Sequence, residues 1–236
     1  MFGISEKCCL NQFVAKKNFY TYADLTSSDK DLFKDNISKI TLTYQLQPNK
    51  INILPFKDDI REYPLINFFD IVVEKDVKIK RIAEIVMKSI PYPSVITFVW
   101  GDKKQIWTAH QRTNLNDSSK NTLEDFVFTK WLDADDEVFD ITTLNMNNFY
   151  SLYCGIVDKI SIMRAQELTD NVQITGEEAR KLTSDIQELD SKIAMLKSKI
   201  KKETQFNKRM EMNIEIKKLK QKKNLILNKH TEMEDK

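Results

Sequence analysis

The first residues in this sequence that could do chemistry are charged side chains at the end of an apolar segment. Asp70 lies within residues 65–73, and Glu74 and Lys75 follow that segment directly. A metal-dependent nuclease places an acid, and then an acid-x-lysine triplet, on neighbouring strands, because carboxylates hold the cation that activates water. Glu74 and Lys75 are adjacent, however, so their side chains would point to opposite faces of a strand. A magnesium-dependent nuclease centred on Asp70 is therefore only the third hypothesis for this chain.

A second group of acids follows Trp131 and comprises Asp133, Asp135, Asp136, Glu137 and Asp140. Hard divalent cations prefer several carboxylate oxygens, so this group is a candidate metal site. It lacks the glycine and the regular spacing of a calcium-binding loop. The pattern favours a solvated connection that precedes the next helix.

Side chains for other kinds of catalysis are few. The two histidines are His110, near the end of a predicted hairpin, and His230. Cys154 follows Tyr153 in a helical segment, where packing in the core is the simpler interpretation. The four glycines are isolated, so no loop can cradle a phosphate. The sequence thus predicts no catalytic residue, no metal site and no cofactor, and it favours a protein that is not an enzyme.

The three cysteines indicate a reducing compartment. Their number is odd, and Cys8 and Cys9 are adjacent, which suits neither an ordinary disulfide framework nor a zinc knuckle. No apolar stretch approaches the roughly 20 residues that span a bilayer, and no secretory leader is visible. We therefore expect a cytoplasmic protein with no membrane partner.

Charge is distributed unevenly along the 236 residues. The 37 basic and 35 acidic side chains nearly cancel, which excludes a protein that coats a polyanion along its whole length. Residues 176–236 nevertheless contain 16 basic and 11 acidic side chains, and the rest of the chain contains 21 and 24. This division predicts an acidic globular domain over residues 1–170 and a basic appendage over residues 175–236.

The elements of the globular domain alternate between helix and strand patterns. Thr26, Ser27 and Ser28 precede a helix that ends near residue 37, because hydroxyls and early acids stabilise a helix N-terminus. Residues 40–47 alternate between apolar and polar, as in a half-buried strand. A turn at Pro48-Asn49 and a shorter strand over residues 51–54 complete a predicted hairpin.

The segments that follow predict the rest of a sheet. Residues 65–73 are apolar on both faces, as in a central strand, and a helix over residues 77–90 ends before Pro91. A second hairpin is expected from residues 95–100 and 105–110, then a polar loop over residues 114–122 and a strand over residues 126–131. Asn145 is expected to cap a long helix with one apolar stripe. The fold class is therefore α+β, with an antiparallel or mixed sheet and packing helices.

The appendage has the strongest pattern in the chain. Thr175 and Glu178 form a capping box that starts a helix. Its apolar residues then repeat as a heptad seam: Leu182, Ile186, Leu189, Ile193, Leu196 and Ile200. A second seam consists of Met212, Ile216, Leu219 and Ile226, with Lys223 in one of its slots. The seams are out of register by two residues, so they would lie on opposite faces of an unbroken helix.

Two arrangements satisfy this register. The chain folds back near residues 202–207 into an antiparallel helical hairpin, or one long coiled-coil helix offers its two faces to different partners. The seam itself requires a partner, which is its own second helix, a second copy in a homodimer, or another protein. We expect these ten seam residues to form a partner interface.

Basic residues are frequent from the end of the first seam through the second seam, and they form a candidate nucleic-acid-binding tract. The tract comprises Lys197, Lys201, Lys202, Lys208, Arg209, Lys217, Lys218, Lys220, Lys222 and Lys223. Lysines along a helix can lie against phosphates in a sequence-independent, salt-sensitive way. Lysines that flank a coiled coil also serve solubility alone, and both interpretations stay open.

Several motifs resemble an uncharacterised bacterial family, domain of unknown function 4391, over nearly the whole chain. They are Lys16-Lys17-Asn18-Phe19-Tyr20, Ile37-Ser38-Lys39-Ile40, the turn Leu46-Gln47-Pro48-Asn49-Lys50-Ile51-Asn52-Ile53, the step Ile90-Pro91, and Gln205-Phe206-Asn207-Lys208. Gln45 stands where the family pattern has lysine. The resemblance implies no catalytic residue, and it implies genes beside helicases and DNA methyltransferases of restriction-like or antiphage systems.

These observations together give an expected function. The chain is expected to be a non-enzymatic accessory or adaptor subunit that docks on a helicase or methyltransferase through its C-terminal helices. The alternative is a nucleic-acid-binding module that uses the lysine-rich tract.

Overall fold

The protein is described by a computed structural model that covers residues 2–22, 25–114, 117–169 and 173–231. The chain forms two compact units, Met1–Ile160 and Ser161–Lys236, and the division falls within helix α5 (Phe149–Leu168). The domain boundary predicted at residue 170, and residues 232–236 of the predicted appendage, lie outside the described residues. Within the described residues, no helix has the length and apolar character that crossing a bilayer requires.

A mixed sheet forms the centre of the first unit. Its strands run in the order β1-β2-β5-β6-β7-β10, and β11 also pairs with β7. Their bounds are β1 Cys9–Phe13, β2 Ile37–Leu46, β5 Ile66–Val73, β6 Ser94–Trp100, β7 Lys103–Thr108, β10 Val127–Phe128 and β11 Leu132–Asp133. The β5–β6 pair is parallel and the other pairs are antiparallel. The predicted α+β class with a mixed sheet is therefore confirmed.

One face of this sheet is covered by three helices. These are α1 (Lys17–Tyr22), α2 (Ser27–Asn36) and α4 (Ile79–Ser89), and their apolar side chains share a core with Phe69, Ile71 and Val73 of β5. Thr26 and Asp29 form a capping box at the start of α2, as the hydroxyl run predicts. Helix α4 ends because Ile90 is extended, the conformation that the following Pro91 imposes.

The opposite face of the sheet packs against the N-terminal segment and the first half of α5. Phe68 points to this face and its ring lies 5.2 Å from that of Phe2. The buried Tyr153 hydroxyl accepts a hydrogen bond from the Thr108 hydroxyl at 2.6 Å and lies 2.8 Å from the carbonyl oxygen of Ala109, to which it donates. Burial raises the pKa of Tyr153 to about 12. Helix α5 is capped by Asn148, three residues later than the Asn145 that the sequence favoured.

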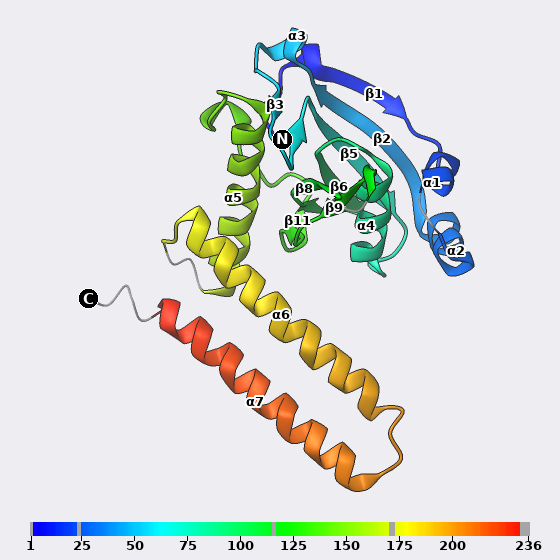
Figure 1. Cartoon of the computed structure of the whole chain (residues 1–236), viewed down its shortest axis with the longest axis vertical. Coiled ribbons are helices and arrows are strands. Elements are labelled where there is room, and N and C mark those ends of the chain that lie inside the picture. The colour runs from blue at the N-terminus through cyan, green and yellow to red at the C-terminus, as the bar shows by residue number, and fades with distance from the viewer. Residues whose placement is uncertain (1, 23–24, 115–116, 170–172, 232–236) are drawn as a thin grey trace. The chain divides into compact units, whose positions relative to one another are not determined.

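The predicted hairpin of residues 40–47 and 51–54 is wrong. Residues 48–51 form a short helix, α3 (Pro48–Ile51), because proline suits the first helical turn and Asn52 ends it in the left-handed region at φ 52°. Beyond it, Leu54 makes only an isolated bridge to Asn148. Strand β2 instead lies between β1 and β5 (Figure 1).

The polar loop predicted over residues 114–122 is also wrong in its described part. The backbone forms a hairpin of β8 (Gln111–Asn114) and β9 (Asp117–Leu123), and residues 115–116 lie outside the described residues. The strand predicted over residues 126–131 is replaced by the short strands β10 and β11. Strand pairing uses backbone groups, so it can form where side chains show no apolar alternation. The remaining elements are η1 Glu6–Cys8, β3 Phe56–Lys57, β4 Glu62–Tyr63 and η2 Ile141–Thr143.

The second unit contains a helical hairpin. Helices α6 (Gly176–Ile200) and α7 (Phe206–Thr231) lie side by side and are joined by residues 201–205 (Figure 1). The predicted capping box is present, since Thr175 and Glu178 each accept from the other's backbone amide. Of the two arrangements compatible with the seams, the structure has the hairpin.

Candidate functional site

The hairpin brings the ten predicted interface residues together. Ile193 and Leu196 of α6 pack with Ile216 of α7, and Ile200, Met212 and Leu219 extend this cluster. Leu182 and Ile186 pack with Ile226 and Leu227 further along the hairpin, and Leu189 is buried between the two groups in sequence. Each seam therefore finds its partner in the other helix of the same chain. Fold-back reverses the direction of α7, which lets two seams that are out of register on one helix face each other.

An ion pair joins the two helices within this seam. The Lys223 ammonium lies 2.7 Å from both carboxylate oxygens of Asp190. The side chain of Lys223 is 25% exposed, so its aliphatic stem continues the apolar contact while the charged end reaches solvent. Lys223 lies in the second seam, as the sequence predicted, but its ion pair with Asp190 was not predicted.

The other nine residues of the predicted nucleic-acid-binding tract are exposed. They lie on the last turns of α6, on the connecting segment and along α7. Residues 197–223 contain 11 basic and 3 acidic side chains. Among the described residues, no ion pair joins Lys217, Lys218 or Lys220 to a carboxylate. The loop end of the hairpin and the outside of α7 therefore present a positively charged surface.

A second apolar surface on α7 was missed at the level of sequence. Phe206, Met210 and Ile214 are 72%, 50% and 52% exposed, and Leu225 is 70% exposed. We call these four residues the outer stripe. Two residues along a helix rotate by about 200°, so Ile214 lies nearly opposite its neighbours Met212 and Ile216 in the seam. The i, i+4, i+8 spacing of apolar residues from Phe206 was the available signal, but it is shorter than the heptad pattern on the same helix.

The acids that suggested metal chemistry do not form one site. Asp70 lies on β5, where burial raises the pKa of its carboxyl, and Glu74 accepts a hydrogen bond from the Ser38 hydroxyl. Asp133 pairs with Lys103 at 2.9 Å, and Asp140 caps η2. Within the described residues, no three His, Cys, Asp or Glu side chains are grouped as a metal site requires.

A cluster of aromatic rings in the first unit, in which Tyr63 and Tyr153 are buried and His110 and Tyr150 are half-buried, was also missed. The Tyr63 hydroxyl lies 2.8 Å from Nδ1 of His110, and the rings of Tyr150 and Tyr153 contact both. Arg61 pairs with Glu124 at 2.7 Å beside Tyr150. These residues come from distant parts of the chain, so no local pattern could reveal the cluster. It joins β4, the turn between β7 and β8, and α5.

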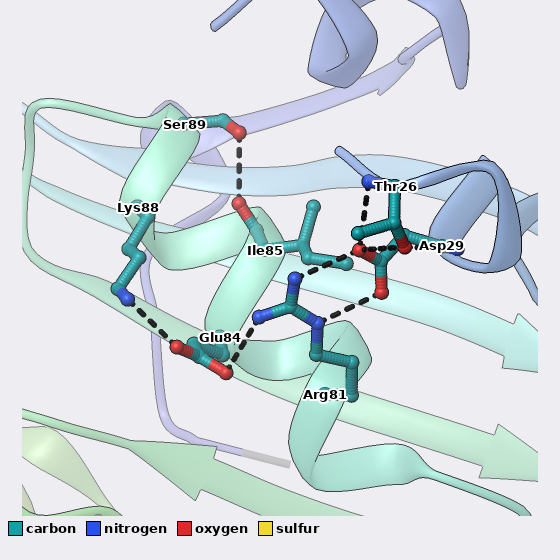
Figure 2. A network of polar contacts seen from close by, with 7 residues as sticks. All are labelled: Thr26, Asp29, Arg81, Glu84, Ile85, Lys88 and Ser89. Atoms are coloured by element: carbon teal, nitrogen blue, oxygen red, sulfur yellow. Dashed lines mark hydrogen bonds and ion pairs between the residues drawn. The ribbon is translucent and has the colours of Figure 1, made fainter. Parts of the chain in front are cut away.

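A polar network ties α2 to α4 in the first unit, as Figure 2 shows. The Arg81 guanidinium donates through Nε and Nη2 to the two carboxylate oxygens of Asp29, each at 2.8 Å. Its Nη1 donates to Glu84, which also accepts from Lys88. The Arg81 hydrogen bonds hold the pKa of Asp29 well below its ordinary value, and Thr26 assists. This network fixes α2 against α4 and has a structural role. The exposed surface of the hairpin is therefore the candidate functional surface.

Comparisons with known proteins give one finding. The sequence model of an uncharacterised family, Domain of unknown function (DUF4391), matches residues 2–222 of this chain. No curated protein and no solved structure matches it.

Proposed function

This chain belongs to the family described as Domain of unknown function (DUF4391), and from that premise we propose that it is a non-enzymatic accessory subunit that docks on a larger protein through its C-terminal hairpin. The observation that carries the proposal is the surface of the hairpin. Its two seams cover each other, yet α7 still exposes the outer stripe and many basic side chains. Exposed apolar groups in a row are typical of an interaction surface.

The class of partner follows from the resemblance described above. It implies neighbouring genes for helicases and DNA methyltransferases, so the proposed partner is such a DNA-acting enzyme in a restriction-like or antiphage defence system. The three free cysteines are in keeping with a cytoplasmic location, where thiols stay reduced.

Affinity purification of the full chain tests this function. The chain is purified from its native host with the neighbouring system induced, and added nuclease removes bridging DNA. We expect a helicase or methyltransferase to be recovered with the wild-type chain and with Met195→Asp, and at least tenfold less with Ile193→Asp, which opens the hairpin. Recovery of neither enzyme class, or equal recovery with Ile193→Asp, would contradict the proposal.

The exposed lysines favour a second candidate function, which is sequence-independent binding of nucleic acid. Four of them, Lys217, Lys218, Lys220 and Lys222, follow one another on α7 within two turns and are all exposed. Point charges spaced closely along one helix can each neutralise one phosphate and release its counterion. Binding by this route depends steeply on salt and little on base sequence.

Replacing these four lysines by glutamine should lower both affinity and salt dependence. With a labelled 20-base-pair DNA duplex, we expect the magnitude of the slope of log affinity against log salt to fall by about 3.6 when four phosphate contacts are lost. Glutamine at the exposed Lys30, Lys39, Lys75 and Lys80 of the first unit serves as the matched control. Binding that is absent, indifferent to salt or equally affected by the control excludes this function.

A further inference from the structure

The outer stripe gives α7 two apolar faces, and only one of them is explained by the hairpin. Five of the twelve large apolar side chains that are exposed among the described residues lie on the hairpin, and four of these make up the outer stripe. The seam on the other face packs against α6. Folding of the hairpin therefore does not account for Phe206, Met210 and Ile214.

The spacing of the outer stripe defines the shape of what can cover it. Phe206, Met210 and Ile214 recur every four residues, and Leu225 follows Ile214 after 11 residues, close to three helical turns. The four side chains thus lie within about 100° of one another on the helix surface and form a ridge, inclined to the helix axis, that extends about 28 Å along it from Phe206 to Leu225. Such a ridge fits the groove between side chains of a second helix.

Charge around the ridge selects the chemistry of that helix. Lys217 and Lys218 stand beside the ridge between Ile214 and Leu225, and Lys222 lies one turn further along. Glu211 and Glu215 are the two acids of α7, and both lie before Lys217. A partner with carboxylates next to its own apolar stripe complements this surface. Residues 206–223 contain seven basic and two acidic side chains, so a second copy of α7 would bring two surfaces of net positive charge together, which opposes pairing.

We propose that the outer stripe of α7 binds an amphipathic helix of about 20 residues with acidic flanks, supplied by the partner protein, so that α6, α7 and this helix form a three-helix assembly. This inference rests on the accessory function proposed above and names the chemistry of the surface that performs the docking. It places the contact on the outer stripe and leaves the heptad seams inside the hairpin.

Photo-crosslinking in the native host tests the proposal with a matched control on the same hairpin. Benzoylphenylalanine replaces Met210 in one variant and Met195 in another. Met195 is 52% exposed, as Met210 is 50% exposed, but it lies on α6 outside the stripe. We expect position 210, and not position 195, to crosslink to a segment with apolar residues at helical spacing and an excess of acids.

A peptide of the crosslinked segment then gives the quantitative test. We expect it to bind the full wild-type chain and Met195→Ser with affinities within twofold. The double variant Met210→Ser, Ile214→Ser should bind at least tenfold more weakly, and added salt should weaken the wild-type complex. Circular dichroism of the double variant should retain the wild-type helix signal, because the substituted side chains are exposed.

The outcomes separate this inference from the accessory function. Crosslinks from position 210 to nucleic acid, to a second copy, to the same chain or to a basic segment overturn the acidic-helix proposal, and so does the absence of a crosslink. If the partner is still lost on Ile193→Asp, the accessory function stands and only the assignment of its surface fails. If the partner is retained by Ile193→Asp, both fail.

Discussion

Replacing Ile193 by aspartate should separate α6 from α7 and lower the free energy of unfolding of the hairpin by about 4 kcal/mol. Ile193 is 7% exposed and packs with Leu196 and Ile216. Removal of a buried isoleucine side chain costs about 2–5 kcal/mol, and a carboxylate at the same place adds a desolvation cost. Helices of about 25 residues draw most of their stability from such packing, so the loss should spread along both helices.

Hydrogen exchange resolved by peptide measures this effect in the full chain. Protection should fall across α6 and α7, and peptides of β5 and β6 in the first unit should keep their wild-type exchange. The control is Met195→Asp, two residues away and 52% exposed, for which we expect a change within about 0.5 kcal/mol. Unchanged protection of α7 in Ile193→Asp would show that the seams do not hold the hairpin together.

Replacing Asp29 by asparagine should destabilise the first unit by about 2 kcal/mol at neutral pH. The carboxylate is 10% exposed and accepts two hydrogen bonds from Arg81, so its neutral replacement weakens two charge-assisted contacts at once. Arg81 is 37% exposed, and solvent screening keeps the loss below that of a fully buried pair. Denaturant unfolding followed by tryptophan fluorescence measures the change, because Trp107 lies in the hydrophobic core that α2 and α4 form with the sheet.

The contribution of Asp29 should also depend on pH. Because the folded-state pKa lies below the unfolded value of about 3.9, the ionised form is favoured by folding. Its stabilisation is fully present above the unfolded pKa and is lost as pH falls through the folded pKa. The difference between wild type and Asp29→Asn should therefore be constant from pH 7 to about pH 5 and shrink below about pH 4.

An exposed acid on the same helix provides the control for this variant. Asp31→Asn removes the same charge from α2 two residues further on, and we expect a change within about 0.5 kcal/mol with no such pH dependence. Equal effects of the two substitutions would assign the loss to net charge and not to the Arg81 contact.

Elements with a continuous local pattern were predictable from sequence. Strand β5 is apolar on both faces and lies in the centre of the sheet, and α2 begins at the capping box of Thr26 and Asp29. The predicted hairpin of residues 40–47 and 51–54 was wrong because two local signals compete at its turn. Pro48-Asn49 suits a tight turn and a helix start equally well, and the structure takes the helix, so β2 finds its partners in β1 and β5. Local sequence rules cannot predict which strands pair with β2, because strand partners are selected by packing over the whole sheet.

The same division applies to the candidate site. The sequence by itself determined the two heptad seams, the capping box at Thr175 and the excess of lysine, because each is a regular spacing of residue types along one helix. Only the tertiary structure decided that the seams cover each other, that Lys223 pairs with Asp190, and that Phe206, Met210 and Ile214 stay exposed. Periodicity defines the faces of a helix, but which face is buried depends on where the chain folds back.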